Sequence, residues 1–272
     1  SKQPMASELK RIKKRKETKN ELDDLYEKSE HVLLIHYSCE SFYDIKDGRT
    51  PRVTSVAVRN LKTAQTESFS IHKIAERRGV EIADIPDRYD ELEKEMLDDF
   101  FEFLKYRQTS HFIHWNMRDG NYGFSAIEHR YQVLGGEPFV VPDDKKFDLA
   151  RALVALFGRQ YVNHGDFGRF HELIRLNRMT DKGALTGKEE ADAFDAGEYV
   201  KLHQSTLRKV DCMSNIVERT VDGSLETNAT WRDKYGAHPK AIIEYVQEHW
   251  LWSLLVIFAI SSGVVGRILG WF

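Results

Sequence analysis

The residues best suited to recognising a ligand form a short run after the strand-like sequence HFIH. The run is Trp115, Asn116, Arg118, Asp119, Asn121 and Tyr122. Aromatic rings stack on nucleobases, and an arginine fork binds phosphate oxygens. We therefore predict a nucleobase or phosphate site here. The alternative is that the aromatic side chains anchor the following helix and the polar groups cap it.

Histidine is the other residue type that could do chemistry, since it binds metals and carries protons near neutral pH. The chain has eleven histidines, but His111 and His114 fall on opposite faces of a strand and cannot share one metal ion. The loop 163–166 (NHGD) has no nucleophile nearby, so we interpret it as a turn. P-loop, dinucleotide, nucleophile-elbow and zinc motifs are absent from the sequence, which predicts no resident metal or cofactor.

These residues would be positioned by alternating strands and helices. We predict strands at 31–37, 50–61 and 66–72, which form an antiparallel meander, an amphipathic helix at 90–106 and a buried strand at 111–115. A helix at 122–134, a short strand at 146–149, a helix at 150–157 and a largely helical segment at 189–219 with a break at Gly197 follow. The pattern predicts an α/β fold with a mixed sheet flanked by helices.

Residues 1–30 are predicted to be a charged helical arm on the surface. Its basic cluster, Lys10 to Lys16 (KRIKKRK), is suited to anionic lipid or nucleic acid, or is a solvated helix face. The net charge of −3 therefore says little about partners. Two cysteines, Cys39 and Cys212, make no disulfide framework and fit a reducing compartment. No secretory signal is present at the N-terminus, so we expect the body, residues 31–237, in the cytoplasm.

The segment 250–272 has one charged residue, Arg267, and is long enough to cross the ~30 Å hydrocarbon core of a bilayer. We predict a juxtamembrane helix at 238–249 and a single transmembrane helix at 250–272. Interfacial anchors would be Trp250, Trp252, Arg267 and Trp271. Ser262, Gly266 and Gly270 recur every four residues, a pattern that lets two membrane helices approach closely, so homo-oligomerisation is an expectation. The alternative is a buried core helix.

Three segments resemble the DEDD-type 3'-5' exonucleases, which have a ribonuclease H-like fold. Residues 33–42 (LLIHYSCESF) with 52–58 look like the family's first two strands, and 113–124 (IHWNMRDGNYGF) is similar to its second motif. Residues 203–216 (HQSTLRKVDCMSNI) resemble its last helix. The resemblance implies a nuclease in which four carboxylates hold two metal ions about 4 Å apart.

The carboxylates of that family are largely replaced in this chain. The first-strand pair falls on His36 and Ser38 and the last aspartate on Lys209, whose ammonium would repel divalent cations. Only Asp119 matches. An active exonuclease with Mg or Mn would need a shifted set, which is Glu40, Asp119, His203 and Asp211. Residues 209 and 211 are about 200° apart around a helix, so the Asp211 side chain would point away from the metal site that residue 209 faces.

The sequence therefore predicts a membrane-anchored, catalytically degenerate exonuclease-like domain. We expect it to bind nucleic acid, a nucleotide or a protein, with His36, Ser38, Trp115, Asn116, Arg118, Asn121, Tyr122 and Lys209 as binding residues. By analogy of architecture, a bacterial defence effector or sensor would suit this arrangement. The alternatives are an active membrane-tethered exonuclease and an oligomerising, membrane-disrupting effector.

Overall fold

A computed structural model describes residues 3–41 and 50–235. Within these residues five strands form one mixed sheet in the order β3-β2-β1-β4-β5. The strands are β1 (Val32–Cys39), β2 (Val53–Asn60), β3 (Thr66–Ser70), β4 (His111–His114) and β5 (Lys146–Asp148). β1, β2 and β3 form an antiparallel meander, whereas β4 and β5 run parallel to β1 on its other side. The carboxyl ends of β1, β4 and β5 therefore lie along one end of the sheet.

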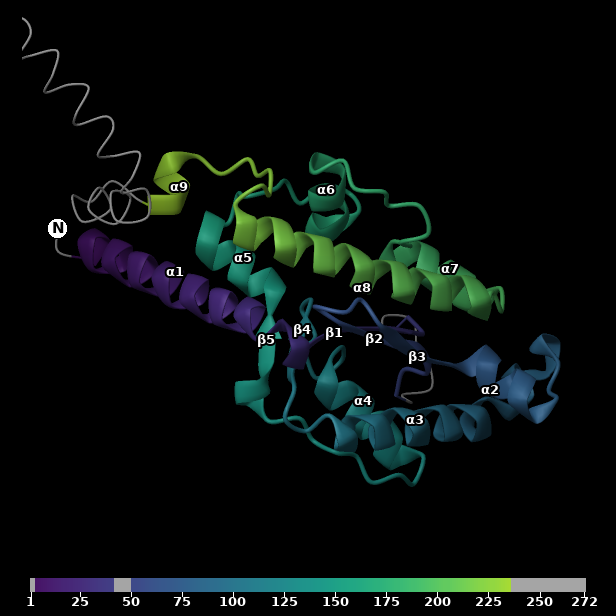
Figure 1. Cartoon of the computed structure of the whole chain (residues 1–272). Coiled ribbons are helices and arrows are strands. Elements are labelled where there is room, and N and C mark those ends of the chain that lie inside the picture. Colours follow the sequence, from purple (N-terminus) through teal and green to yellow (C-terminus); the bar gives the residue numbers. More distant parts are fainter. Residues whose placement is uncertain (1–2, 42–49, 236–272) are drawn as a thin grey trace, which may run out of the picture.

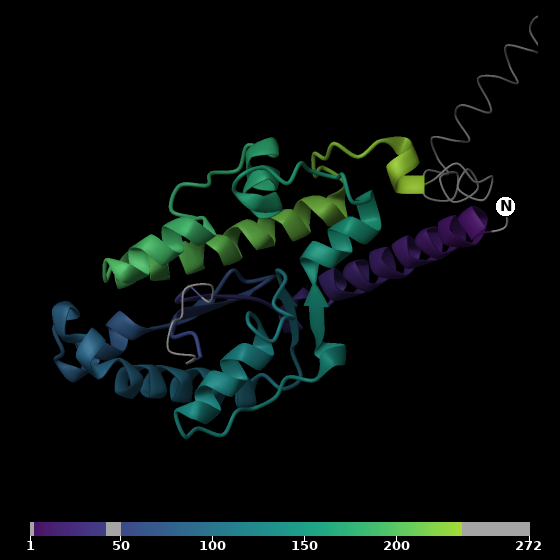
Figure 2. The same ribbon diagram turned by 180° about the vertical axis from the view of Figure 1, so that it is seen from behind.

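Helices cover both faces of this sheet (Figure 1 and Figure 2). α3 and α4 lie on one face, and α1, α5, α6 and α8 lie on the other. The helices are α1 (Gln3–Glu27), α2 (Ile71–Arg78), α3 (Tyr89–Tyr106), α4 (Phe124–Val133), α5 (Leu149–Phe157), α6 (Gly168–Leu176), α7 (Gly187–Asp195), α8 (Tyr199–Asp222) and α9 (Trp231–Tyr235). The predicted α/β class, a mixed sheet flanked by helices, is confirmed.

The alternation of side chains along β1 divides the core into two clusters. Leu33, Ile35 and Tyr37 join the cluster beneath α3 and α4, while Val32 and Leu34 join the cluster that includes α1, α5 and α8. Successive side chains of a strand point to opposite faces. His36 and Ser38 therefore continue the face covered by α8, but with polar side chains.

Most of the predicted elements are present within a few residues of their expected ends. One boundary differs: the predicted strand at 66–72 ends at Ser70, and α2 starts at Ile71. Ile71, Ile74 and Ala75 are buried and have helical spacing, so the apolar face of α2 outweighs the strand propensity of the preceding residues. α6 was not predicted, although Phe170, Leu173 and Ile174 give it the same kind of buried face.

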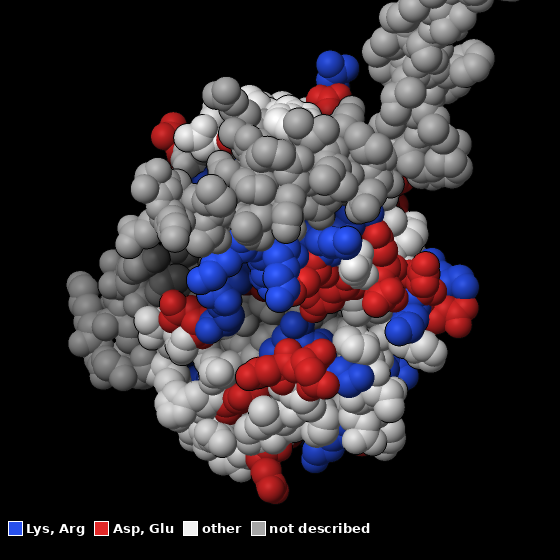
Figure 3. Space-filling view, turned by 90° about the vertical axis from the view of Figure 1, so that its left-hand side faces the viewer, with Lys and Arg blue, Asp and Glu red and all other residues white. Residues whose placement is uncertain are grey.

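The N-terminal helix is confirmed, but it is not an exposed arm. Leu22 and Leu25 are buried in the cluster shared with α5 and α8, and Arg15 Nε donates to the Leu156 carbonyl at 3.1 Å. Lysine and arginine side chains gather beside acidic ones on the side at which α1 begins (Figure 3). The exposed residues of the basic cluster are Lys10, Arg11, Lys13, Lys14 and Lys16. α1 thus buries one face and leaves its basic one in water.

The predicted membrane segments lie outside the described residues. These are the juxtamembrane helix at 238–249 and the transmembrane helix at 250–272, with its anchors Trp250, Trp252, Arg267 and Trp271 and the small residues Ser262, Gly266 and Gly270. Among the helices at 3–41 and 50–235, none has the length and apolarity needed to cross a bilayer.

Candidate functional site

A buried polar cluster lies where α8 and α7 cover the carboxyl end of β1. It consists of His36 and Ser38 from β1, Ser55 from β2, Glu190 from α7, and Ser205, Thr206 and Lys209 from α8. Every one of these side chains except Glu190 belongs to a buried residue. Polar groups removed from water need partners, so their hydrogen bonds define what the cluster can do.

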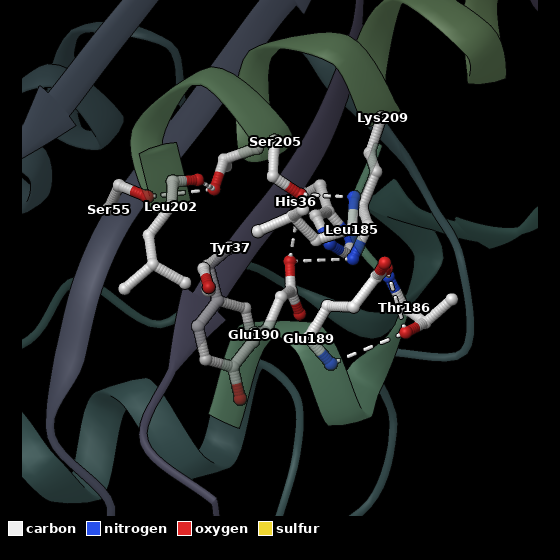
Figure 4. Close-up of polar contacts among 12 residues, drawn as sticks. His36, Tyr37, Ser55, Leu185, Thr186, Glu189, Glu190, Leu202, Ser205 and Lys209 are labelled. Atoms are coloured by element: carbon white, nitrogen blue, oxygen red, sulfur yellow. Dashed lines mark hydrogen bonds and ion pairs between the residues drawn. The ribbon is translucent and has the colours of Figure 1, made fainter. Parts of the chain in front are cut away.

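An ion pair between Lys209 and Glu190 is the main interaction of the cluster (Figure 4). Lys209 Nζ donates to Glu190 Oε1 at 2.7 Å, and the two side chains are only 8% and 14% exposed. Ser205 Oγ donates to the same oxygen at 3.0 Å and accepts from the Leu185 amide. The carboxylate is thus neutralised by a lysine and held in place by a serine.

The start of α7 is fixed by its own sequence, which explains how Glu190 reaches this position. Thr186 and Glu189 form a capping box: Thr186 Oγ1 accepts from the Glu189 amide, and the Glu189 carboxylate accepts from the Thr186 amide (Figure 4). Such a box satisfies the free amides of a helix start. Glu190, in the first turn, is then directed at α8.

His36 lies beside Lys209 in the cluster (Figure 4). Burial, with the nearby charges of Lys209 and His171, holds the pKa of His36 well below its usual range. Its Nδ1 lies 3.4 Å from the hydroxyl of Tyr122, which also donates to the Tyr37 carbonyl. Within the described residues, His36 Nε2 and Ser38 Oγ are buried without a hydrogen-bond partner.

Among the described residues, the cluster contains neither a set of metal ligands nor an activated nucleophile. In the described parts of the chain, no three His, Cys, Asp or Glu side chains come together as a metal site. Burial raises the pKa of Cys39 and raises that of Cys212 to about 11, so both thiols stay protonated. Ser38 Oγ has no base bonded to it, so it is not an activated nucleophile.

The structure does not bring the shifted set of candidate ligands together. Asp119 accepts from the Asn121 amide in an exposed turn before α4, and Asp211 pairs with Arg208 and Arg59. His203 lies next to His72, with ring centroids 5.1 Å apart. Glu40 accepts from the Arg52 amide. These four side chains therefore act in separate local contacts.

A second feature, which we call the arginine pocket, lies at the carboxyl ends of β4 and β5. It has a volume of about 430 Å³, within the ~300–1,000 Å³ range of small-molecule sites. It is lined by Trp115, Asn116, Arg118, Ala150, Arg151, Val154, Tyr161, His164 and Arg169. The basic residues come from four segments that are separate in sequence: the turn after β4, α5, the loop before α6, and α6 itself.

Asp148 holds one wall of the arginine pocket in place. Its carboxylate caps α5 by accepting from the Ala150 and Arg151 amides, pairs with the Arg118 guanidinium, and accepts from the Asn116 amide at 3.2 Å. Arg118 also donates to Asn116 Oδ1 at 2.6 Å. Asn116 has a φ of 58°, a left-handed conformation that asparagine tolerates better than most residues. These contacts fix the direction of Arg118 before any ligand arrives.

The sequence-predicted binding residues divide between the two features. Trp115, Asn116 and Arg118 line the arginine pocket, and His36, Ser38 and Lys209 lie in the buried polar cluster, which Tyr122 contacts. Asn121 lies in the exposed turn with Asp119. Residues that sequence reasoning missed are Glu190, Ser205, Arg151 and Arg169, whereas His164, which lines the arginine pocket, lies in the 163–166 loop that the sequence led us to interpret as a turn. Two local signals lie near them: the TGKE sequence at 186–189, which marks a helix start next to Glu190, and the motif at 203–216, which contains Ser205.

No protein-family model, curated protein or solved structure matches this chain.

Proposed function

We propose that this chain is a ribonuclease H-like domain that has lost two-metal catalysis, binds nucleic acid or nucleotides through their phosphates, and is held at a membrane by residues 250–272. The observation that carries the proposal is the Lys209 to Glu190 ion pair beside His36 and Ser38. His36, Ser38 and Lys209 stand at the positions where the motifs of DEDD-type exonucleases would place carboxylates.

The likeness is supported by the juxtaposition of segments distant in sequence. A meander of three strands, a helix, an inner strand and further helices follow one another in the described fold, as the motifs imply. α8, which carries the third motif, packs on β1 and β2. The side chain of residue 209 consequently lies beside that of residue 36 (Figure 4), although neither is a carboxylate.

The electrostatics of the cluster explain why catalysis would be absent. A divalent cation needs several anionic oxygens, but Glu190 already has the Lys209 ammonium at 2.7 Å. A second cation at that oxygen would be repelled at close range, because charges in a poorly solvated site are weakly screened. His36, which is neutral, supplies no negative charge. The site is thus electrostatically complete without a metal.

The membrane part of the proposal rests on the sequence of residues 250–272, with one charge in 23 positions. An apolar stretch of that length is typical of a spanning helix. The exposed basic cluster of α1 would then face anionic headgroups or nucleic acid. Both points are separate from the argument on catalysis.

The first test measures cleavage and binding by the full chain in detergent micelles. A labelled single-stranded oligonucleotide is incubated with Mg²⁺ or Mn²⁺ and analysed for shortening, and its binding is followed by fluorescence anisotropy. We expect binding without cleavage. Metal-dependent cleavage that is lost in Asp119→Ala would overturn the proposal in favour of an active exonuclease, and absence of any binding would remove the nucleic-acid function.

The second test restores the carboxylates. The triple variant His36→Asp, Ser38→Glu, Lys209→Asp is compared with His36→Asn, Ser38→Gln, Lys209→Asn, which has matched shapes but no added charge. We expect Mn²⁺ binding, measured by electron paramagnetic resonance, in the acidic triple variant only. Equal Mn²⁺ binding by the two variants would show that these positions do not converge as a two-metal centre requires.

A further inference from the structure

We propose that the arginine pocket binds a phosphate monoester that carries a nucleobase, either a free mononucleotide or the phosphorylated end of a nucleic acid. This inference rests on the proposed function and names the ligand class and its site. The site is distinct from the buried polar cluster, because it lies at the ends of β4 and β5 and no residue lines both.

The charge balance of the pocket favours an anion. Three arginines line it, and the Asp148 carboxylate pairs with one of them, Arg118. Among the described residues neither Arg151 nor Arg169 forms an ion pair, and Arg169 Nε is buried without a hydrogen-bond acceptor. Buried donors without acceptors are unfavourable. An oxyanion with several acceptor oxygens would satisfy them.

The number and type of donors match a phosphate better than a carboxylate. Guanidinium groups bind phosphate through paired, charge-assisted hydrogen bonds. Arg151 from α5 and Arg169 from α6 approach from different segments, and His164 adds an exposed imidazole at the rim. A tetrahedral dianion presents oxygens in several directions at once, whereas a carboxylate presents two in one plane. Donors that converge from separate segments therefore suit the phosphate.

The aromatic residues of the pocket support the nucleobase part of the proposal. Trp115 is partly exposed and held by an edge-to-face contact with Phe170, with ring centroids 4.9 Å apart at 70°. Tyr161 is buried, and the central carbon of the Arg169 guanidinium lies over its ring, 6.0 Å from the ring centroid. An indole that is fixed in place and reaches the cavity is a stacking platform for a planar base. Inorganic phosphate would use the arginines alone, and a nucleotide would use both.

The experiment titrates the full chain, in detergent micelles, by isothermal calorimetry. The probes are the four ribonucleoside 5'-monophosphates, inorganic phosphate, adenosine, and one oligonucleotide with and without a 5'-phosphate. We expect at least one nucleotide to bind at least tenfold more tightly than phosphate or adenosine. A preference for the phosphorylated oligonucleotide over the free nucleotides would assign the ligand as a nucleic-acid end, and the reverse would assign a free nucleotide.

Variants locate the binding. Arg151→Gln/Arg169→Gln should weaken nucleotide binding at least tenfold, whereas Arg77→Gln/Arg78→Gln, an equal loss of charge on α2, should change it less than twofold. Trp115→Leu should reduce the preference for nucleotide over phosphate, with phosphate binding kept as evidence that the variant is folded. If the wild type binds oligonucleotides but the Arg151→Gln/Arg169→Gln variant binds them equally well, the arginine pocket is not the binding site and the proposed function stands. If the wild type binds none of the probes, both fail.

Discussion

If the Lys209 to Glu190 ion pair stabilises the fold, removing one partner should lower the free energy of unfolding by a measurable amount. Lys209→Met removes the ammonium but keeps much of the side-chain volume. It leaves the Glu190 carboxylate 14% exposed, with the Ser205 hydroxyl as its remaining hydrogen-bond donor among the described residues. Breaking a buried ion pair by removing one partner costs about 3–5 kcal/mol. Because Glu190 retains the serine hydrogen bond and a little water contact, we expect the lower end, about 3 kcal/mol.

That loss is large enough to measure in unfolding experiments. For a domain of this size, 1 kcal/mol lowers Tm by roughly 2–4 °C, so Lys209→Met should unfold about 6–12 °C below the wild type. The double variant Lys209→Met/Glu190→Gln removes both charges, and replacing a buried pair by neutral groups is often close to neutral in stability. It should recover most of the lost stability.

The chain contains a matched control on the same helix. Lys201 pairs with Glu198, also at 2.7 Å, but these side chains are 52% and 47% exposed. Exposed pairs contribute about 0–1 kcal/mol, so Lys201→Met should change Tm by no more than a few degrees. Urea and thermal unfolding of the full chain in detergent give both values. If Lys209→Met is no more destabilising than Lys201→Met, the ion pair is not the buried interaction described above.

Three further predictions concern other parts of the chain. Burial lowers the pKa of His36 and lowers those of His114 and His203 to about 4. Below pH 6.5 the unfolded chain therefore binds more protons than the folded one, and the urea concentration at the unfolding midpoint should be lower at pH 5.5 than at pH 7.5. Equal midpoints would contradict neutral buried imidazole rings. Gly123 has a φ of 151°, and a Cβ atom there would lie 2.5 Å from the Met117 carbonyl carbon. Gly123→Ala should therefore destabilise the protein by about 1–3 kcal/mol in the same urea assay. The control is Gly120→Ala, whose Cβ would meet nothing within 4 Å and should leave the stability unchanged. Deletion of residues 250–272 should move the protein from the membrane pellet to the supernatant on ultracentrifugation, and a full-length chain that stays in the supernatant without detergent would refute the anchor.

The fold was largely predictable from the sequence because its signals are local. In β1, the short apolar run at 31–37 predicts a strand, and the structure buries both of its faces, Val32 and Leu34 on one and Leu33 and Ile35 on the other. α2 was missed because its buried face spans only Ile71 to Ala75, within a segment that also has strand character. When the apolar residues of a short segment fit both the strand period and the helix period, tertiary packing decides which of the two forms, and the local sequence does not contain that information.

The candidate sites were predictable only in part, because each joins residues that are far apart in the chain. Trp115, Asn116 and Arg118 were found as a run after a strand, and they form one wall of the arginine pocket. Arg151 and Arg169 come from helices whose exposed arginines look like ordinary solvated charges in sequence. Glu190 was missed for the same reason: a glutamate in the first turn of a helix is expected from the helix dipole alone, and only its approach to Lys209 gives it a further role.

Under the proposed function, the two features explain how this chain would hold phosphates without metal ions. In a two-metal site the cations bind the phosphate, and the protein supplies the carboxylates that hold them. In this chain Lys209 neutralises Glu190 of α7 beside the end of β1. Among the described residues, Arg151 and Arg169 form no ion pair, and they line the arginine pocket at the ends of β4 and β5. If the proposed function is right, positive charge supplied by arginine has taken over phosphate binding but not the activation of water. Phosphate binding should then persist in the presence of a chelator such as EDTA, and loss of binding on chelation would instead require a metal ion that the cluster geometry gives no place to hold.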